Sequence, residues 1–173
     1  MRLGELLALR WADVDLPGHR IAVRGTLARG DPGLMVTETK TGRIRLVLLT
    51  TAASEALDRR RVVQAGERRR AGDEWVELDF VFTNEFGRPL DPSNVRLRSF
   101  RPALERAELP RIRFHDLRHT AATLMLGQGV HPKMVSEMLG HSQIGITLDL
   151  YSHVTPSMQA GAVQALEALL GVP

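Results

Sequence analysis

The chain of 173 residues contains one tyrosine, Tyr151, which lies ten residues after His141. A phenol beside a base is a nucleophile that can attack phosphorus and hold the product as a covalent ester. The alternative is a packing role, with the ring half-buried and the hydroxyl on a carbonyl. The residues that accompany Tyr151 decide between these two interpretations.

A histidine and an arginine, His115 and Arg118, stand three residues apart. On a helix this spacing puts both side chains on one face, while Leu117, Ala121 and Leu124 point elsewhere, toward a core. Such pairs also occur on solvated helix faces, so the spacing alone does not establish a site. It does allow an imidazole and a guanidinium to act on one ligand.

Taken together, six residues supply the groups that phosphoryl transfer without a metal ion needs. Arginines neutralise the non-bridging oxygens of a pentacoordinate phosphorane. A lysine protonates the leaving 5′ oxygen, and an imidazole hydrogen-bonds the phosphate or takes the proton of the phenol, whose free pKa is about 10. The candidate catalytic residues are Arg2, Lys40, His115, Arg118, His141 and Tyr151.

Arginine supplies nearly all the positive charge, and Lys40 and Lys133 are the only lysines. An arginine-rich surface suits nucleic acid, because the planar guanidinium pairs with phosphate through two hydrogen bonds. GC-rich coding raises the arginine content as well, and both explanations stay open. A lysine in such a chain indicates a proton donor, since arginine does not release its proton.

Short strands and a series of helices are expected to position these residues. Runs of Val, Ile and Leu predict strands over 20–24, 34–37 and 44–49, with Lys40 in the turn between the last two. A turn is expected over 13–18 and another short strand over 80–82. Apolar spacing and capping residues predict helices over 3–11, 52–70, 92–107, 115–126, 132–139 and 156–170, and a turn or two of helix up to Tyr151.

Length and composition fit one soluble domain with a substantial core. The chain has no cysteine, no apolar run long enough to span a membrane and no signal peptide at its start. Disulfides and thiolate metal sites are therefore excluded, and we expect a cytoplasmic protein without a membrane partner.

Five segments closely resemble, in chain order, the motifs of the catalytic domain of the tyrosine recombinase (phage integrase) family. The resemblance spans nearly the whole chain. It implies that Arg2 and Arg118 are the catalytic arginines, with His115 beginning the H-x-x-R motif. It also implies that Lys40 is the lysine of a β-hairpin, that His141 is the second histidine and that Tyr151 is the nucleophile. The five segments are residues 1–15, 39–45, 115–123, 139–142 and 147–153.

The resemblance implies an α+β fold that is mainly α-helical, with a small antiparallel three-stranded sheet. The implied function is site-specific DNA recombination, in which a strand is cut to a 3′-phosphotyrosyl intermediate and a free 5′-hydroxyl and is then religated to a partner strand. Neither a metal nor another cofactor is implied. The partner is double-stranded DNA, in the bacterial cytoplasm and at the nucleoid when bound. Supporting roles are expected for Glu5, which would orient a nearby arginine, and for His119 and His153.

The chain departs from the family pattern at its start. Family members carry a DNA-clamping domain of helices, and their catalytic domain begins with one or more helices ahead of the first arginine. We therefore expect residues 1–173 to be an N-terminally truncated catalytic domain that lacks the core-binding domain, with Arg2 near a frayed end. Weak DNA binding and impaired recombination by the isolated chain follow.

The predicted helix over 156–170 carries a broad apolar stripe. One interpretation is that the stripe packs against the core of its own chain. In the other, which follows from the resemblance, the segment docks on a neighbouring protomer and so links the four subunits of a homotetramer on DNA.

Two other functions remain open from sequence alone. The first is a zinc hydrolase. His115 and His119 have the spacing of the two zinc-binding histidines on a metalloprotease helix, and Asp116 stands where the glutamate of that helix would be. Residues 132–139, Gly140 and the short helix after them have the pattern of a helix-turn-helix, so a non-catalytic DNA-binding remnant of an integrase is the second.

Overall fold

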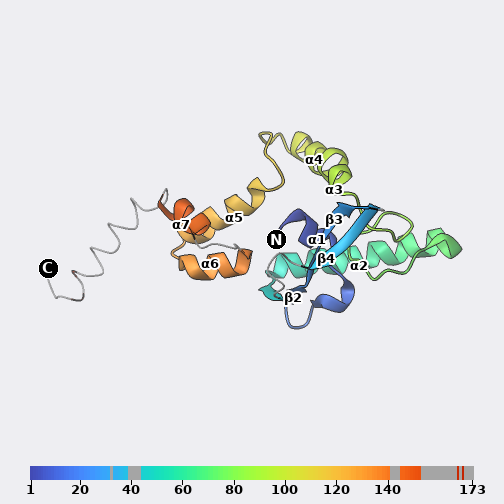
Figure 1. Ribbon diagram of the computed structural model, residues 1–173, viewed down its shortest axis with the longest axis horizontal. Helices are drawn as coiled ribbons and strands as arrows, with labels where there is room; N and C mark the ends of the chain where they lie inside the picture. The colour runs from blue at the N-terminus through green and yellow to red at the C-terminus, as the bar shows by residue number, and fades with distance from the viewer. Residues whose placement is uncertain (32, 39–43, 141–144, 153–166, 168, 170–173) are drawn as a thin grey trace. The chain divides into compact units, whose positions relative to one another are not determined.

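The computed structural model describes residues 1–31, 33–38, 44–140, 145–152, 167 and 169. These residues belong to two compact units, one over residues 1–114 and the other from His115 onward. The first unit contains helices α1 to α4 and strands β1 to β5, and the second contains helices α5 to α7 (Figure 1).

The first unit begins with the short helix α1 (Leu3–Leu7). The sequence predicts a helix that continues to Trp11, but α1 ends earlier because the following backbone pairs with another segment. The amide of Val81 donates to the Leu9 carbonyl, and the amide of Trp11 donates to the Asp79 carbonyl, each at 2.9 Å. A 3-10 turn, η1 (Trp11–Asp13), follows.

An antiparallel sheet of three strands is present as predicted, but not all of its strands are the expected ones. It consists of β1 (Val14–Asp15), β2 (Arg20–Val23) and β5 (Arg45–Leu48), in the order β1-β2-β5. The turn predicted over 13–18 is therefore partly wrong, because Val14 and Asp15 pair with Ile21 and Arg20.

The predicted strand at 34–37 exists, but it belongs to a separate two-stranded sheet. It lies within β4 (Gly33–Glu38), which pairs with β3 (Gly25–Gly30) along its whole length. The sequence does not predict β3, because a glycine at each end and Ala28 lower its strand propensity. The predicted turn with Lys40 lies between β4 and β5, outside the described residues.

Residues 80–82 do not form the predicted strand. Phe80 makes an isolated antiparallel bridge to Arg10, because the segment between α1 and η1 is too short for a longer ladder. Val81 is nevertheless completely buried and packs with Leu9, Ile21 and Leu57. The apolar character of this segment thus reflects its place in the core and not a sheet.

Helix α2 (Thr51–Ala71) is the helix predicted over 52–70, and it begins as the sequence suggests. The Thr50 hydroxyl accepts a hydrogen bond from the Ala53 amide at 3.2 Å, which caps the helix. A 3-10 turn, η2 (Gly72–Glu74), follows it. In the part of the chain that the structure describes, no helix is both long enough and apolar enough to cross a membrane.

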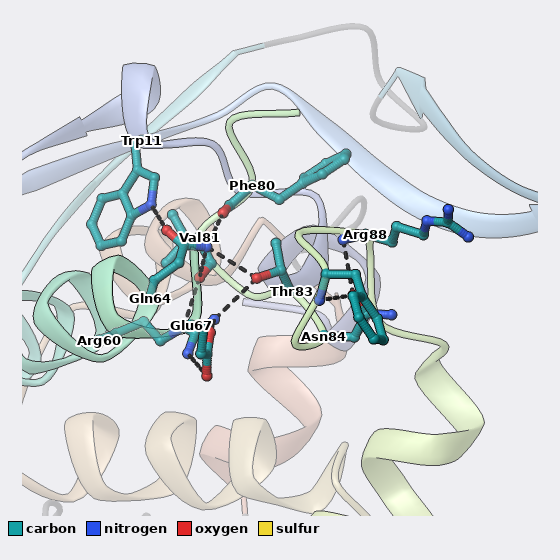
Figure 2. A network of polar contacts seen from close by, with 10 residues as sticks. Trp11, Arg60, Gln64, Glu67, Phe80, Val81, Thr83, Asn84 and Arg88 are labelled. Carbon is teal, nitrogen blue, oxygen red and sulfur yellow. Dashed lines mark hydrogen bonds and ion pairs between the residues drawn. The ribbon is translucent and has the colours of Figure 1, made fainter. Parts of the chain in front are cut away.

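The buried side-chain amide of Gln64, on α2, forms hydrogen bonds with the backbone of residues 80–81, which is not part of a sheet (Figure 2). Its nitrogen donates to the Phe80 carbonyl at 2.8 Å and to the Thr83 hydroxyl at 3.1 Å. Its oxygen accepts from the indole nitrogen of Trp11 at 2.6 Å. Because buried polar groups need partners, Gln64 takes the place of a neighbouring strand for this segment.

Arg60, one turn earlier on α2, extends the same network (Figure 2). Its Nε donates to the Val81 carbonyl at 3.0 Å, and its two terminal nitrogens pair with the Glu67 carboxylate at 3.0 and 2.9 Å. The network therefore fixes the segment after α2, and through Leu9 and Val81 it fixes the end of α1.

The helix predicted over 92–107 is present, and Asp91 caps it. The Asp91 carboxylate accepts from the Ser93 amide at 2.7 Å and from the Asn94 amide at 3.2 Å. The sequence does not predict the π-helical middle of this stretch. Pro102 offers a reason, because it has no amide for the Arg98 carbonyl and would crowd it in a regular helix. The three parts are α3 (Pro92–Asn94), η3 (Val95–Phe100) and α4 (Arg101–Arg106).

The described residues of the second unit contain three helices that contact one another (Figure 1). They correspond to the helices predicted over 115–126 and 132–139 and to the short one ending near Tyr151. Their core includes the buried side chains of Ala122, Leu126, Val135 and Leu139. The helix predicted over 156–170 lies outside the described residues, apart from residues 167 and 169. The three helices are α5 (Asp116–Gly127), α6 (Pro132–Leu139) and α7 (Gly145–Ser152).

Replacement of Gly4 by alanine tests how closely α1 packs on β3. A Cβ atom at Gly4 would lie 2.7 Å from the Leu27 carbonyl oxygen and would also overlap the Thr26 hydroxyl. We expect Gly4→Ala to lower the free energy of unfolding by about 1–3 kcal/mol, because backbone has to move. Gly66→Ala on α2, where an added Cβ has no neighbour within 4 Å, is the matched control. Urea unfolding that finds Gly4→Ala as stable as the parent would contradict this packing.

Replacement of Gln64 by leucine tests the polar network. The indole N–H of Trp11 and the Phe80 carbonyl would each lose a hydrogen bond, so we expect destabilisation by about 2–3 kcal/mol. Val63→Leu, on an exposed part of the same helix, should stay within about 0.5 kcal/mol of the parent in the same urea titration. Equal stability of the two variants would show that the network does not stabilise the fold.

Candidate functional site

Arg2, the first candidate catalytic residue, is bonded to Glu5 at two points. Its backbone amide donates to Glu5 Oε2 at 2.8 Å, and its Nη1 donates to Glu5 Oε1 at 2.9 Å. The Arg2 side chain is 40% exposed, whereas that of Glu5 is 2% exposed. The predicted pairing of Glu5 with a nearby arginine is confirmed, and Arg2 is held in place where the sequence predicts a frayed position.

A second arginine, Arg45, reaches the same carboxylate from β5. Its Nη2 donates to Glu5 Oε2 at 2.9 Å, and its side chain is 17% exposed. The sequence does not single out Arg45. No sequence signal marks it, because its place on the inner face appears only in the structure, where Arg45 and Val47 are half-buried and Leu46 and Leu48 are exposed. A cation on the inner face of a strand requires a buried anion.

Glu5 is ionised at neutral pH in this arrangement. Burial by itself would raise the pKa of Glu5. The hydrogen bond from the Arg2 amide, the bond and charge of Arg45 and the bond from the Arg2 guanidinium outweigh burial, so the pKa lies below its ordinary value. The carboxylate is therefore available to hold two guanidinium groups.

The second unit carries the H-x-x-R pair at the start of α5. His115 is the N-cap residue and is exposed, whereas Arg118 is buried. His119 lies one turn from His115, and the two rings meet edge to face with their centroids 4.9 Å apart. The pair thus presents an imidazole at the surface and a guanidinium within the unit.

Arg118 connects α5 to the end of α6. Its Nη1 donates a hydrogen bond to the carbonyl of Leu139, the last residue of α6. Gly140 follows in the left-handed conformation, with φ 70°, and ends the helix. Because the last carbonyls of a helix have no partner within it and carry partial negative charge, a guanidinium stabilises this end. His141 comes next in the sequence.

Tyr151 lies near the end of α7, which contacts both α5 and α6. Within α7, Thr147 is completely buried, so the helix is packed into the unit. The helix with Arg118, the helix that ends before His141 and the helix with Tyr151 therefore form one small assembly.

The remaining candidates cannot be placed in the same way, because Lys40, His141 and His153 lie outside the described residues. Among the candidates in the described ranges, Arg2 and Glu5 belong to the first unit, and His115, Arg118, His119 and Tyr151 belong to the second. No group of three His, Asp or Glu side chains within those ranges is arranged to hold a metal ion.

Glu5, Arg2 and Arg45 form a charged triad. Replacement of Glu5 by glutamine tests how the stability that this triad provides depends on pH. The pKa of Glu5 is lowered in the folded protein, so its stabilising effect is present above the unfolded-state pKa and is lost as pH falls through the folded-state pKa. We expect Glu5→Gln to lower the free energy of unfolding by about 3 kcal/mol at pH 7, because Arg45 loses its buried partner.

The difference between Glu5→Gln and the parent should narrow in urea titrations as the pH falls below about 4.3, the ordinary pKa of a glutamate, because the unfolded chain then binds a proton that the folded carboxylate binds only at lower pH. Glu85→Gln changes an exposed carboxyl group and serves as the control. A gap of the same size at pH 7 and at pH 3 would argue against an ionised Glu5.

Comparison with known proteins identifies the family. Residues 1–158 match the phage integrase family. The chain is 36% identical to a tyrosine recombinase XerC-like protein of Caldanaerobacter subterraneus, over 98% of this chain and 46% of the relative. It is also 36% identical to an integrase of Streptomyces ambofaciens, over 94% of this chain and 44% of the relative.

Solved structures show the same fold. The integrase of the Tn1549 transposon, in complex with a circular intermediate DNA, superimposes with a TM-score of 0.77 at 22% identity, over 95% of this chain and 54% of that one. XerA recombinase gives a TM-score of 0.67 at 24% identity, over 99% of this chain and 53% of that one. The fold is that of a tyrosine recombinase catalytic domain, as predicted.

The comparisons favour neither the zinc hydrolase nor the non-catalytic remnant. The chain spans less than half the length of the relatives named above. With its match over residues 1–158 and its similarity to recombinases and integrases, the chain belongs to the phage integrase family of tyrosine recombinases.

Proposed function

We propose that this chain is the catalytic part of an enzyme that cuts and rejoins double-stranded DNA at specific sites, with Tyr151 as the nucleophile. The observation that carries the proposal is the packing of α5, α6 and α7 in one unit. These helices bear the H-x-x-R pair, end next to His141 and contain Tyr151. Family membership supports the same reading, because the match over residues 1–158 includes every candidate residue.

In the proposed reaction, the phenol oxygen of Tyr151 attacks the scissile phosphorus, and the bond to the 5′ oxygen breaks. The phenolic proton passes to an imidazole, for which His115 and His141 are the candidates. Lys40 donates a proton to the departing 5′ oxygen. The reverse step rejoins the 5′-hydroxyl of a partner strand, and since a phosphoester is kept throughout, no other energy source is needed.

Arg2 and Arg118 are proposed to bind the non-bridging oxygens of the same phosphate. Each guanidinium already has a fixed partner in its own unit, Glu5 for Arg2 and the Leu139 carbonyl for Arg118. Donors that are fixed before substrate arrives stabilise developing charge without further reorganisation. This preorganisation is the physical reason to give the two arginines catalytic roles.

Assembly and location belong to the same proposal. We expect a homotetramer on DNA, linked through the apolar stripe of segment 156–170, in a bacterial cytoplasm and at the nucleoid when DNA is bound. A core-binding domain elsewhere in the whole protein would hold the duplex. The isolated chain of 173 residues is therefore expected to recombine poorly, although a single cleavage needs only the groups named above.

Trapping of the covalent intermediate tests the nucleophile. The probe is a pool of nicked duplexes with randomised sequence, from which a cleaved fragment diffuses away and leaves the protein attached. We expect an adduct that survives denaturation with the parent and none with Tyr151→Phe, because the phenol oxygen is the attacking atom. No adduct with the parent, or an equal yield with Tyr151→Phe, would refute the proposal.

A sulfur atom in place of the bridging 5′ oxygen tests the general acid in the same assay. A thiolate leaves without protonation, so the defect of Lys40→Ala should be about 100-fold or more with oxygen and should largely disappear with sulfur. Lys133→Ala changes the other lysine and should match the parent on both pools. A defect of Lys40→Ala that persists with sulfur would exclude Lys40 as the acid.

A further inference from the structure

The carboxylate of Glu5 is shared by two arginines, and only Arg2 has a proposed role in the reaction. Oε1 accepts from Arg2 Nη1 at 2.9 Å. Oε2 accepts from the Arg2 amide at 2.8 Å and from Arg45 Nη2 at 2.9 Å. Arg45 therefore contacts the same carboxylate as Arg2, but its guanidinium binds Oε2, whereas the Arg2 guanidinium binds Oε1.

The charges of this triad explain why a second arginine is useful. A buried carboxylate paired with Arg2 alone would fix that guanidinium but would also cancel most of its charge. With Arg45 included, two positive groups surround one negative group, and the triad keeps a net positive charge. Arg2, with its side chain 40% exposed, is the member of the triad with the most exposed side chain.

Burial makes Arg45 a poor candidate for direct contact with DNA. Its side chain is 17% exposed, less than half the value for Arg2. Its Nε is buried and has no hydrogen-bond partner within the described ranges. An incompletely satisfied buried cation is unfavourable for stability, so a role other than stabilisation is the better explanation for Arg45.

On the basis of the function proposed above, we propose that Arg45 is a positioning residue for catalysis. Its guanidinium balances the charge of Glu5, so that Glu5 fixes the geometry of Arg2 without cancelling the positive charge that Arg2 offers to the scissile phosphate. Arg45 acts through Glu5 and Arg2 and does not touch the substrate.

Single-turnover cleavage of the nicked duplex pool tests this role. Two substrates are compared, one with a normal phosphate at the position of cleavage and one with an uncharged methylphosphonate there. We expect Arg45→Met to slow cleavage of the phosphate by about 100-fold, as misplacement of a catalytic group does. On the methylphosphonate, which lacks the negative charge, the slowing should be below about 3-fold, because little charge remains for Arg2 to neutralise.

Three further variants separate positioning from general damage to the fold. Arg45→Lys keeps the positive charge and should recover most of the lost rate. Arg20 lies on β2, the strand next to β5, and forms an exposed ion pair with Asp15 of β1. Arg20→Met removes this ion pair, and the variant should cleave like the parent. In an Arg2→Met background, Arg45→Met should add less than about 3-fold, because residues that act as one unit are not additive. Equal slowing on both substrates, or additive effects with Arg2→Met, would overturn the inference.

Titration of Glu5 by carbon NMR of its carboxyl group gives a readout that does not depend on cleavage. Loss of Arg45 should raise the pKa of Glu5, because burial then acts against fewer stabilising partners, while Arg20→Met should leave the titration unchanged. An unchanged titration in Arg45→Met would overturn the inference by itself. Failure of the parent to form any adduct, together with a raised pKa in Arg45→Met, would overturn the cleavage function and with it the catalytic role of Arg45, while leaving the charge balance at Glu5 established.

Discussion

A carboxylate that is buried in a protein is stable in its ionised form only when cations or hydrogen-bond donors surround it, and Glu5 is such a group in this chain. Glu5 is almost completely shielded from water, and its ionised form is stabilised by Arg2 and Arg45. The two arginines come from separate elements, the N-cap of α1 and strand β5. The ion triad therefore links helix α1 to strand β5 and, at the same time, holds the first candidate catalytic arginine.

In the described part of the second unit, the buried charged group is a cation, Arg118. It donates a hydrogen bond to the backbone carbonyl of Leu139 at the end of α6. A helix end offers partial negative charge without neutralising an arginine as a carboxylate would. In each unit a candidate arginine therefore has an acceptor that fixes its position, the Glu5 carboxylate for Arg2 and the Leu139 carbonyl for Arg118. That property suits groups whose proposed task is to bind a phosphate.

Most of the helices could be predicted from sequence, because their signals are local. Thr50 and Asp91 cap helices within three residues of themselves, Gly140 ends α6, and the spacing of His115 and Arg118 needs only one helical turn. The candidate catalytic residues follow from motifs of the same short range. Their convergence on a single phosphate remains a prediction.

The features that escaped prediction depend on contacts between distant residues. The sequence does not predict the pairing of β3 with β4, because the glycines of β3 lower its strand propensity. The segment at 80–82 has the composition of a strand, but the side chain of Gln64 on α2 forms a hydrogen bond that a neighbouring strand would otherwise form. Arg45 is one of many arginines in the sequence, and only its position opposite Glu5 distinguishes it. Sequence patterns report which residues are buried more readily than which partners they meet.

The proposed function requires Arg2 and Arg118 to bind the same scissile phosphate. A crystal structure of Tyr151→Phe bound to an uncleaved duplex tests this claim most directly. We predict that Arg2 and Arg118 both donate hydrogen bonds of about 3 Å to the non-bridging oxygens of the same phosphate, with residue 151 on the side opposite the 5′ oxygen. Arginines bound to different phosphates, or only one of them in contact with the DNA, would contradict it.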